Sequence, residues 1–327
     1  LNVVYPADVS QVRPLDVFMA HMDVVFSDET ELPLRVEDGR IYCPGVGDDT
    51  ACLVCLLLAG KYIARHVDSP SWREIRGEDA PGLLLVCNAG EEGLGNLKGV
   101  RKICEDYGGR IKSFCTFDSS LSSIVDRAVG SKRFRVKVRT RGGHSYNDFG
   151  NDNAIAGLAS LVGKLYKIQV PEGGKTTYNV GMISGGTSVN TIAQEAEMLY
   201  EFRSDKRENL EYMERQFMEV LDRAKAEGMD VSFQVIGVRP CEGQVDPAQK
   251  QALTDWAHRV VEEMTGQAPK HHAGSTDCNI PLSLGIPSVC VGSFRGAGAH
   301  TREEYVETDS LEEGYKVAFG MIFGRRD

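Results

Sequence analysis

The hydrophobic pattern of the chain changes twice along its length, and this limits the folds open to it. Up to about residue 130, continuous apolar runs such as "LDVFMAHMD" (15–23) and "GLLLVCNAG" (82–90) alternate with helical segments such as 49–67. Segment 49–67 is apolar on most faces, so we expect a buried helix there. Continuous apolar strands separated by helices are typical of a mostly parallel sheet that is covered on both faces. We therefore expect an α/β domain whose sheet carries helices on both faces.

The middle of the chain has a different pattern. The segment "SKRFRVKVRTR" (131–141) alternates polar and apolar residues, which indicates a strand with one face in water. The elements expected after it are a helix at 153–168, strands at 177–185 and 195–203, a charged amphipathic helix at 208–227 and a strand at 230–237. This β-α-β-β-α-β order is that of a ferredoxin-like α+β domain.

The first pattern returns after Pro240. We expect a helix at 247–265, a short buried strand at 285–292 and a closing helix at 310–324. The first domain is therefore predicted in two parts, residues 1–130 and 240–327, which are interrupted by the ferredoxin-like domain at residues 131–239.

Charge and apolar run length exclude several classes of function. The chain has 327 residues and a formal net charge of −10, which argues against a nucleic-acid surface or a basic face that binds membranes. The longest apolar run, "ACLVCLLLAG" (51–60), is too short to span a bilayer, and no signal peptide is visible. We therefore expect a cytoplasmic protein without nucleic-acid or membrane partners.

The nine cysteines are an odd number and stand mostly in apolar runs. Reduced, buried thiols fit this pattern better than a disulfide framework. Cys52 and Cys55 have the spacing of a metal-binding pair, but the sequence has no second pair with this spacing. Because a structural zinc ion needs four ligands, core packing is the favoured interpretation.

Several of the expected strands end on residue types that bind metals. In parallel α/β sheets, ligands bind beyond the carboxyl ends of the strands. A single Asp before a helix is usually a cap, a Glu pair in a loop is usually solvated, and a single His is usually structural. Such residues occur in five separate segments, and five independent coincidences at one sheet edge are much less probable than one shared site. The residues in these segments are His21 and Asp23, Asp48 and Asp49, Glu91 and Glu92, Asp118, and His300.

The number and type of these side chains indicate the chemistry. Two histidines with three or four carboxylates and no thiolate suit two divalent ions such as zinc, with cobalt and manganese as alternatives. One carboxylate must then bridge the ions. Asp23, two residues after His21, emerges on the same side of the strand and can fix the tautomer of that histidine, whereas Met22 between them is expected to point the other way, into the core. One Glu must stay off the metal as a proton acceptor, and Glu91 and Glu92 can divide these two roles.

These residues resemble the co-catalytic zinc family that includes peptidase T-like di- and tripeptidases, glutamate carboxypeptidases, aminoacylases, acetylornithine deacetylases and succinyl-diaminopimelate desuccinylases. The resemblance covers nearly the whole chain. It is carried, in order, by "HMD", "GVGDD", "GEEG", "FDSS", "GGHS", "GGTSVN…FR", "GSTDCNIPLSLGIPSV" and "GAHTREE".

The resemblance implies a role for each metal ligand. His21 and Asp118 would bind one metal, and Glu92 and His300 the other. Asp48 would bridge the two ions, and the peptide bond between Asp48 and Asp49 is a candidate cis bond.

The resemblance also implies catalytic and substrate-binding residues. Asp23 would orient His21, and Glu91 would be the general base. The inserted domain would be a lid that pairs two chains into a homodimer. His144 would reach the partner subunit's site and steady the developing oxyanion. Asn190 and Arg203 would contact the substrate, and Gly274 and Ser275 match the loop that lines the pocket.

The activity implied is metal-dependent hydrolysis of an amide bond in short peptides, with N-acyl amino acid deacylation as the alternative. Asp rather than Glu at position 118 favours the peptidase branch. A non-catalytic scaffold would have lost a ligand or the base, and all are present. A serine hydrolase through Ser145 lacks the nucleophile-elbow pattern.

Two departures from the family stand out. Thr50-Ala51 replaces the usual Lys-Gly after the Asp pair, which bears on helix packing rather than on the ligands. Most of the helix and strand that precede "HMD" in the family are missing, so we expect a sheet that lacks an element, or an incomplete chain.

Overall fold

The chain divides into two compact units. The computed structural model describes residues 2–5, 14–26, 31–66, 69 and 80–324. The first unit comprises Leu1–Ala128 and Glu242–Asp327, and the inserted unit comprises Val129–Cys241. The predicted boundaries of the inserted segment, 131 and 239, each lie two residues inside the observed ones.

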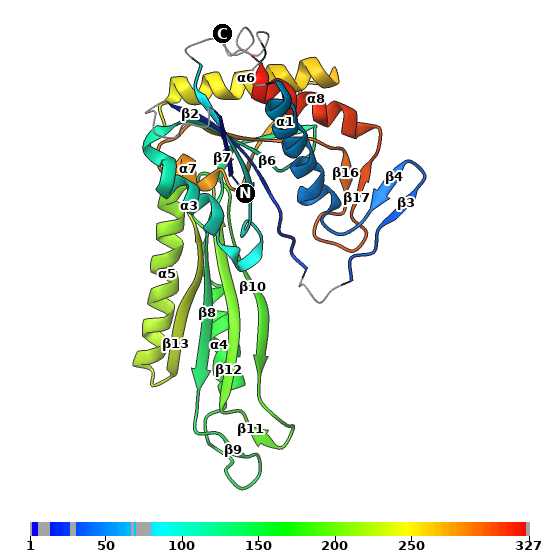
Figure 1. Cartoon of the computed structure of the whole chain (residues 1–327). Coiled ribbons are helices and arrows are strands. Elements are labelled where there is room, and N and C mark those ends of the chain that lie inside the picture. Colours follow the sequence, from blue (N-terminus) through cyan, green and yellow to red (C-terminus); the bar gives the residue numbers. More distant parts are fainter. Residues whose placement is uncertain (1, 6–13, 27–30, 67–68, 70–79, 325–327) are drawn as a thin grey trace. The chain divides into compact units, whose positions relative to one another are not determined.

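Seven described strands of the first unit form a mixed sheet in the order β1-β5-β2-β6-β15-β7-β14 (Figure 1). The neighbours β5, β2, β6 and β15 run parallel, as do β7 and β14, whereas β1 and β7 are antiparallel to β5 and β15. The strands are β1 (Asn2–Tyr5), β2 (Leu15–His21), β5 (Gly82–Asn88), β6 (Ile111–Phe117), β7 (Ser123–Ala128), β14 (Lys270–Gly274) and β15 (Ser288–Val291).

Helices cover both faces of this sheet, which confirms the predicted fold class. One apolar core contains α1 (Cys52–His66), α6 (Pro247–Thr265) and α8 (Ser310–Phe323), and the other contains α3 (Lys98–Tyr107) and α7 (Asn279–Ser283). In β2, Phe18 belongs to the first core and Met19 to the second. Successive side chains of a strand point to opposite faces, so a strand buried on both sides must be apolar throughout.

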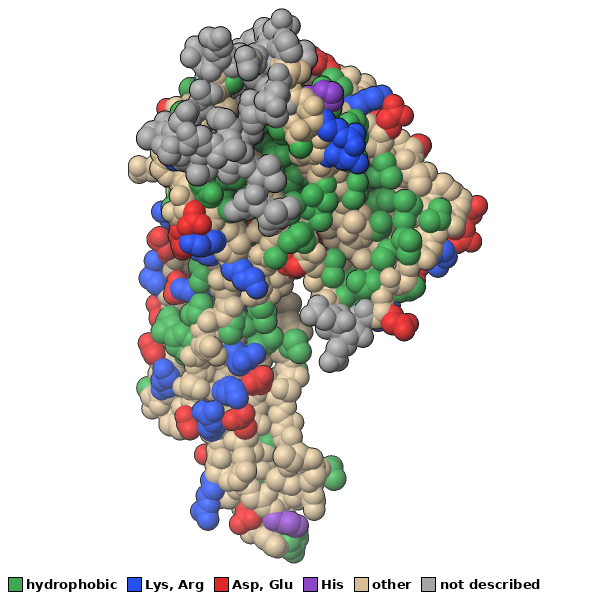
Figure 2. All heavy atoms as spheres, viewed as in Figure 1, with side chains coloured by type: hydrophobic (Ala, Val, Ile, Leu, Met, Phe, Trp, Pro, Cys, Tyr) green, Lys and Arg blue, Asp and Glu red, His purple; other side chains and the backbone are tan. Residues whose placement is uncertain are grey.

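Helix α1 is less buried than its composition suggests. Cys52, Cys55 and Ile63 are buried, and the helix packs on the sheet and on α8. Val54 and Leu57, on the opposite face, are 46% and 47% exposed. Hydrophobic surface is visible around α1 in Figure 2. The expectation of a helix buried on most faces is therefore wrong. One side of α1 packs in the core, and the opposite side is exposed.

A second, smaller sheet joins distant parts of the first unit. Its strand order is β16-β17-β4-β3, so β4 near the start of the chain pairs with β17 near its end. These strands are too short to contain an apolar run, so they are not predicted from the sequence. They are β3 (Arg35–Glu37), β4 (Arg40–Tyr42), β16 (Gly296–Ala297) and β17 (Tyr305–Glu307).

The inserted unit has the predicted ferredoxin-like arrangement. Its antiparallel sheet has the order β10-β12-β8-β13, and helices α4 (Ala154–Leu165) and α5 (Arg207–Ala226) pack on it around Phe134, Tyr200 and Phe217. The strands are β8 (Gly130–Arg139), β10 (Thr176–Gly185), β12 (Glu195–Ser204) and β13 (Asp230–Arg239), with a short pair formed by β9 (Gly143–His144) and β11 (Thr191–Ile192).

All nine cysteines are free, and Cys52 and Cys55 belong to the core beneath α1. In the part of the chain that the structure describes, each helix is too short or too polar to cross a bilayer.

Candidate metal centre

The predicted ligands of the first unit come together at one edge of its sheet. Strand β2 ends on His21, whose side chain is 1% exposed. Glu92 follows β5, and Asp118 follows β6. Asp48 lies in an irregular turn, Val46–Ala51, that leads into α1, and His300 comes from the loop after β16.

Asp48 connects the two histidines. Its Oδ1 lies 3.1 Å from Nε2 of His21, and its Oδ2 lies 3.0 Å from Nε2 of His300. The same nitrogen of His300 lies 3.1 Å from Oε1 of Glu92. Oδ1 of Asp118 lies 4.0 Å from Nε2 of His21. One carboxylate therefore faces a pair of ligands on each side, which is the arrangement a metal-bridging carboxylate requires.

Potential ligand atoms also lie close enough to surround an ion. Three groups of side chains each have ligand atoms within 4.8 Å of one another. They are His21 with Asp49 and Asp118, Asp48 with Glu92 and His300, and His21 with Glu91 and Glu92. The first group contains His21 and Asp118 of one predicted metal position, with Asp49 in place of Asp48, and the second contains Asp48, Glu92 and His300 of the other. The third group brings Glu91 beside His21 and Glu92.

The electrostatics of this cluster favour a bound cation. Burial, with the charges of Asp48 and Glu91, raises the pKa of Glu92 to about 7. Burial and the nearby Asp49 raise the pKa of Asp118 well above its usual range. Burial disfavours a charged His21, but its hydrogen bond to Asp48 and the surrounding carboxylates outweigh burial and raise its pKa to about 12. Crowded, partly buried carboxylates of this kind fit divalent ions, which supply the missing positive charge.

The main-chain carbonyl of Asp23 orients His21. Nδ1 of His21 lies 3.0 Å from that carbonyl oxygen, and 3.8 Å from Oδ1 of the Asp23 carboxylate. A carbonyl can only accept, so Nδ1 carries the hydrogen and Nε2 faces the metal cluster. The predicted contact therefore comes from the expected residue but from a different group. Strand β2 ends at His21, so the turn after it, rather than a continuing strand, brings the carbonyl to the ring.

The carboxylate of Asp23 binds the loop that carries the two glutamates. It accepts hydrogen bonds from the backbone amides of Gly90 (2.8 Å), Glu91 (3.3 Å) and Glu92 (2.9 Å). The side chain of Glu91 is 5% exposed. Asp23 thus fixes the backbone from which both glutamates project.

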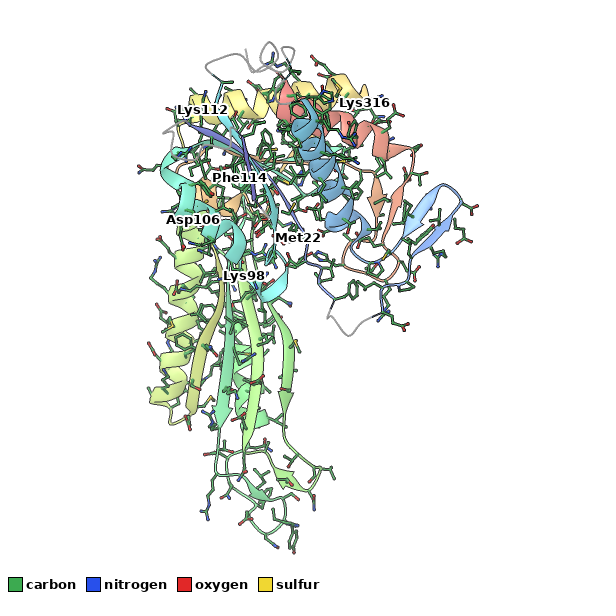
Figure 3. The ribbon with its side chains drawn as sticks, viewed as in Figure 1. Met22, Lys98, Asp106, Lys112, Phe114 and Lys316 are labelled. Atoms are coloured by element: carbon green, nitrogen blue, oxygen red, sulfur yellow. The ribbon has the colours of Figure 1, made fainter. Side chains whose placement is uncertain are left out.

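Met22 does not pack in the core. Its side chain is 52% exposed, and Figure 3 labels it beyond the end of β2. The expectation that Met22 points away from the site into the core is wrong, because that expectation also assumed a continuing strand.

Two carboxylates of the site were missed as supporting groups. Asp49 is 1% exposed and accepts a hydrogen bond of 2.8 Å from the backbone amide of His21, and the peptide bond between Asp48 and Asp49 is cis. Glu304 is 2% exposed and binds the backbone of the loop before Asp48. The sequence offers no signal that separates Glu304 from its exposed neighbour Glu303.

The other predicted residues are not members of these three groups of ligand atoms. His144 and Asn190 have exposed side chains in the inserted unit. Arg203 is in the same unit and donates two hydrogen bonds to Glu201, of 2.8 and 3.2 Å. Gly274 is the last residue of the edge strand β14 in the first unit, and Ser275 follows it.

Known proteins are similar in sequence to this chain over most of its length. The sequence profile described as "Peptidase family M20/M25/M40" matches residues 17–323. An acetylornithine deacetylase of Myxococcus xanthus is 24% identical over 90% of this chain and 75% of its own length. A succinyl-diaminopimelate desuccinylase of Nitrosomonas eutropha is 24% identical over 91% of this chain and 80% of its own length.

Solved structures share the fold. The aminopeptidase PepT of Bacillus cereus aligns with a TM-score of 0.70 and 22% identity, over 99% of this chain and 83% of that one. Human carnosine dipeptidase 1 aligns with a TM-score of 0.72 and 14% identity, over 99% and 82% of the two chains.

Proposed function

Because the chain belongs to peptidase family M20/M25/M40 and is therefore a hydrolase that acts on amide bonds, we propose that it cleaves short peptides at a centre of two divalent metal ions. The observation that carries the proposal is the position of Asp48 between His21 and His300, with one carboxylate oxygen toward each. Zinc fits this set of histidine and carboxylate ligands, and cobalt and manganese are the alternatives.

The ligands of the proposed centre are His21 and Asp118 for one ion, Glu92 and His300 for the other, and Asp48 for both. When bound, the ions supply Lewis acidity at the scissile carbonyl and lower the pKa of a water molecule. The residues around them then hold this water and move its proton.

Glu91 is the proposed general base. It lies in a group with His21 and Glu92, and its backbone is held by Asp23. A carboxylate in this place takes the proton from the attacking water and delivers it to the leaving amine nitrogen, so the amine departs neutral.

Three residues of the inserted unit complete the proposal. His144 would donate a hydrogen bond to the oxyanion that develops on the carbonyl. Asn190 and Arg203 would bind the polar end of the substrate, since an arginine fork matches a terminal carboxylate. Glu201 already accepts hydrogen bonds from Arg203, so a substrate carboxylate would have to compete with it. Gly274 and Ser275 would line the pocket.

The second candidate activity is N-acyl amino acid deacylation at the same site. It is favoured by the sequence relatives, which are named as a deacetylase and desuccinylases. Metal analysis combined with a panel of dipeptides, tripeptides and N-acetyl and N-succinyl amino acids separates the two. Turnover of N-acyl amino acids alone would reject the peptidase assignment, and a protein that binds no divalent ion would reject both.

Replacement of the base gives the sharpest test of the mechanism. Glu91→Gln should retain both metal ions but lose about 100- to 10,000-fold in kcat, because the amide cannot accept the proton. Glu105→Gln, an exposed glutamate on α3, is the control and should keep full turnover. Retention of turnover by Glu91→Gln would exclude this residue as the base.

We further propose that the protein is a cytoplasmic homodimer that pairs through the inserted unit. Nine free thiols suit a reducing compartment. The outer strand β10 carries exposed apolar side chains, Met182 (66%) and Ile183 (58%). An exposed apolar edge strand is a surface that another chain can cover.

A further inference from the structure

Glu304 is a buried carboxylate that belongs to neither predicted metal position. It lies four residues after His300 and directly before strand β17. Its side chain is 2% exposed. A buried carboxylate is costly unless hydrogen bonds or positive charge compensate it, so the groups around it show what it does.

Three backbone amides of one loop donate hydrogen bonds to Glu304. The amide of Gly45 donates to Oε2 at 2.7 Å, and the amides of Gly47 and Asp48 donate to Oε1 at 2.9 and 2.8 Å. The last of these amides belongs to the residue proposed to bridge the metal ions. Hydrogen bonds to an ionised carboxylate are shorter and about twice as strong as those between neutral groups.

The loop is shaped for this contact. A Cβ on Gly47 would lie 2.6 Å from the ring of Phe294 and 3.1 Å from Oε1 of Glu304, so only glycine allows the carboxylate to come this close. Gly45 has a φ of +77°, in the region that glycine adopts without strain.

The main chain joins the same two segments. The amide of Cys43 donates to the carbonyl of Glu304 at 3.1 Å, and Tyr42 pairs with Tyr305 where β4 meets β17. The Asp48 loop and the segment after His300 are therefore connected by the backbone and by the Glu304 side chain.

We propose that Glu304 is a positioning residue that holds the Asp48 loop at a fixed distance from His300, and so forms the metal position of Asp48, Glu92 and His300. This inference rests on the proposed metal centre. The other position takes His21 and Asp118 from the ends of β2 and β6, which the sheet fixes independently of Glu304. Loss of Glu304 should therefore weaken the binding of the ion at Asp48, Glu92 and His300 much more than the binding of the ion at His21 and Asp118.

The test is a metal titration of the purified, metal-free chain. Wild type should bind two Zn²⁺ or Co²⁺ ions. Glu304→Gln presents an NH₂ group where an acceptor is needed, so it should bind one ion with near wild-type affinity and the second about 10- to 100-fold more weakly. Glu303→Gln removes the same charge from the exposed neighbouring residue and should behave as wild type.

Amide hydrogen exchange in the metal-free protein supplies a readout that is independent of activity and of metal. The amides of Gly45, Gly47 and Asp48 should be protected in wild type and in Glu303→Gln, and should exchange faster in Glu304→Gln. If those three amides are unprotected in wild type, the inference is overturned whether or not the variant folds. Excess metal should restore kcat in Glu304→Gln, whereas a general loss of folding would not be reversed in this way.

The outcomes separate the inference from the proposed function. A wild-type chain that binds no ion rejects the metal centre. Two ions bound with equal affinity by wild type and Glu304→Gln leave the metal centre intact and reject the role of Glu304.

Discussion

The buried and half-buried carboxylates around the site divide into proposed metal ligands and groups that bind backbone amides. Asp48, Glu92 and Asp118 face the cluster of ligand atoms, whereas Asp23 and Glu304 each accept hydrogen bonds from three backbone amides. The amides that they bind lie in the two loops that carry Glu92 and Asp48. The proposed ligand positions therefore depend on carboxylates that do not touch metal.

Asp23 allows this division to be tested at one residue. Asp23→Ala removes the acceptor for the amides of Gly90, Glu91 and Glu92, but keeps the main-chain carbonyl that orients His21. We expect at least a 10-fold loss of kcat, because the base and one ligand lose their fixed backbone. The ion at His21 and Asp118 should remain, and metal titration checks this. Loss of that ion would mean that the carboxylate, and not the carbonyl, supports His21.

Residue types at strand ends were sufficient to predict that His21, Glu92 and Asp118 lie at one edge of the sheet, because the carboxyl ends of parallel strands meet there. Their role as ligands stays a prediction. The position of Met22 was predicted wrongly, since the residue at which a strand stops decides where the next side chain points. The role of Glu304 could not be predicted for another reason. Its partners are backbone amides more than 250 positions away, and because nearly every residue has such an amide, the sequence does not show which ones Glu304 binds.

At the scale of elements, the inserted sheet carries a row of paired charges on its polar face. Arg133 of β8 lies opposite Glu201 of β12 in the strand register and donates a hydrogen bond to it at 3.2 Å. Arg203, two residues further along β12, donates to the same carboxylate. Partial burial disfavours the charge of Glu201, but the hydrogen bonds and charges of Arg203 and Arg133 outweigh it and lower the pKa of Glu201.

This pair of contacts should make the stability of the inserted unit depend on pH. A carboxyl group with a lowered folded-state pKa stabilises the fold above its unfolded value of 4.5, and this contribution is lost as the pH falls through the folded-state pKa. Glu201→Gln should cost about 1 kcal/mol at pH 7, and the difference from wild type should shrink below pH 4.5. Urea unfolding at a series of pH values measures it. A difference that is constant with pH would show that the contacts do not depend on ionisation.

Most long elements were predicted, although helix α3 was not, and most short elements were missed, although the buried strand β15 was expected at 285–292. Helix α6 spans Pro247–Thr265, as expected, because Asp246 caps it, Pro247 starts it and Gly266 ends it. Strands β16 and β17 have two and three residues, too few to show a period. Their existence depends on pairing with β4, which lies far away in the sequence.

At the scale of the whole molecule, the proposed dimer makes a prediction about the outer strand of the inserted sheet. Ile183→Lys places a charge on the exposed apolar part of β10, and charged edge strands oppose pairing. We expect a shift from dimer to monomer, measured by light scattering after size exclusion. Leu284→Lys changes an exposed residue of the first unit (60%) and is the control. A monomeric wild type, or a dimer unaffected by Ile183→Lys, would reject this surface.

The interrupted order of the chain has a consequence for its synthesis. About 180 residues separate Asp118 from His300, and at about 5–20 residues per second a ribosome needs roughly 10–40 s to make them. During this time the nascent chain carries His21, Asp48, Glu92 and Asp118 but lacks His300 and Glu304. The proposed centre can be completed only after the segment that carries His300 and Glu304 has left the ribosome, so metal loading must follow the synthesis of that segment. A transcript that stops early would yield a protein with an intact inserted unit and an incomplete metal centre.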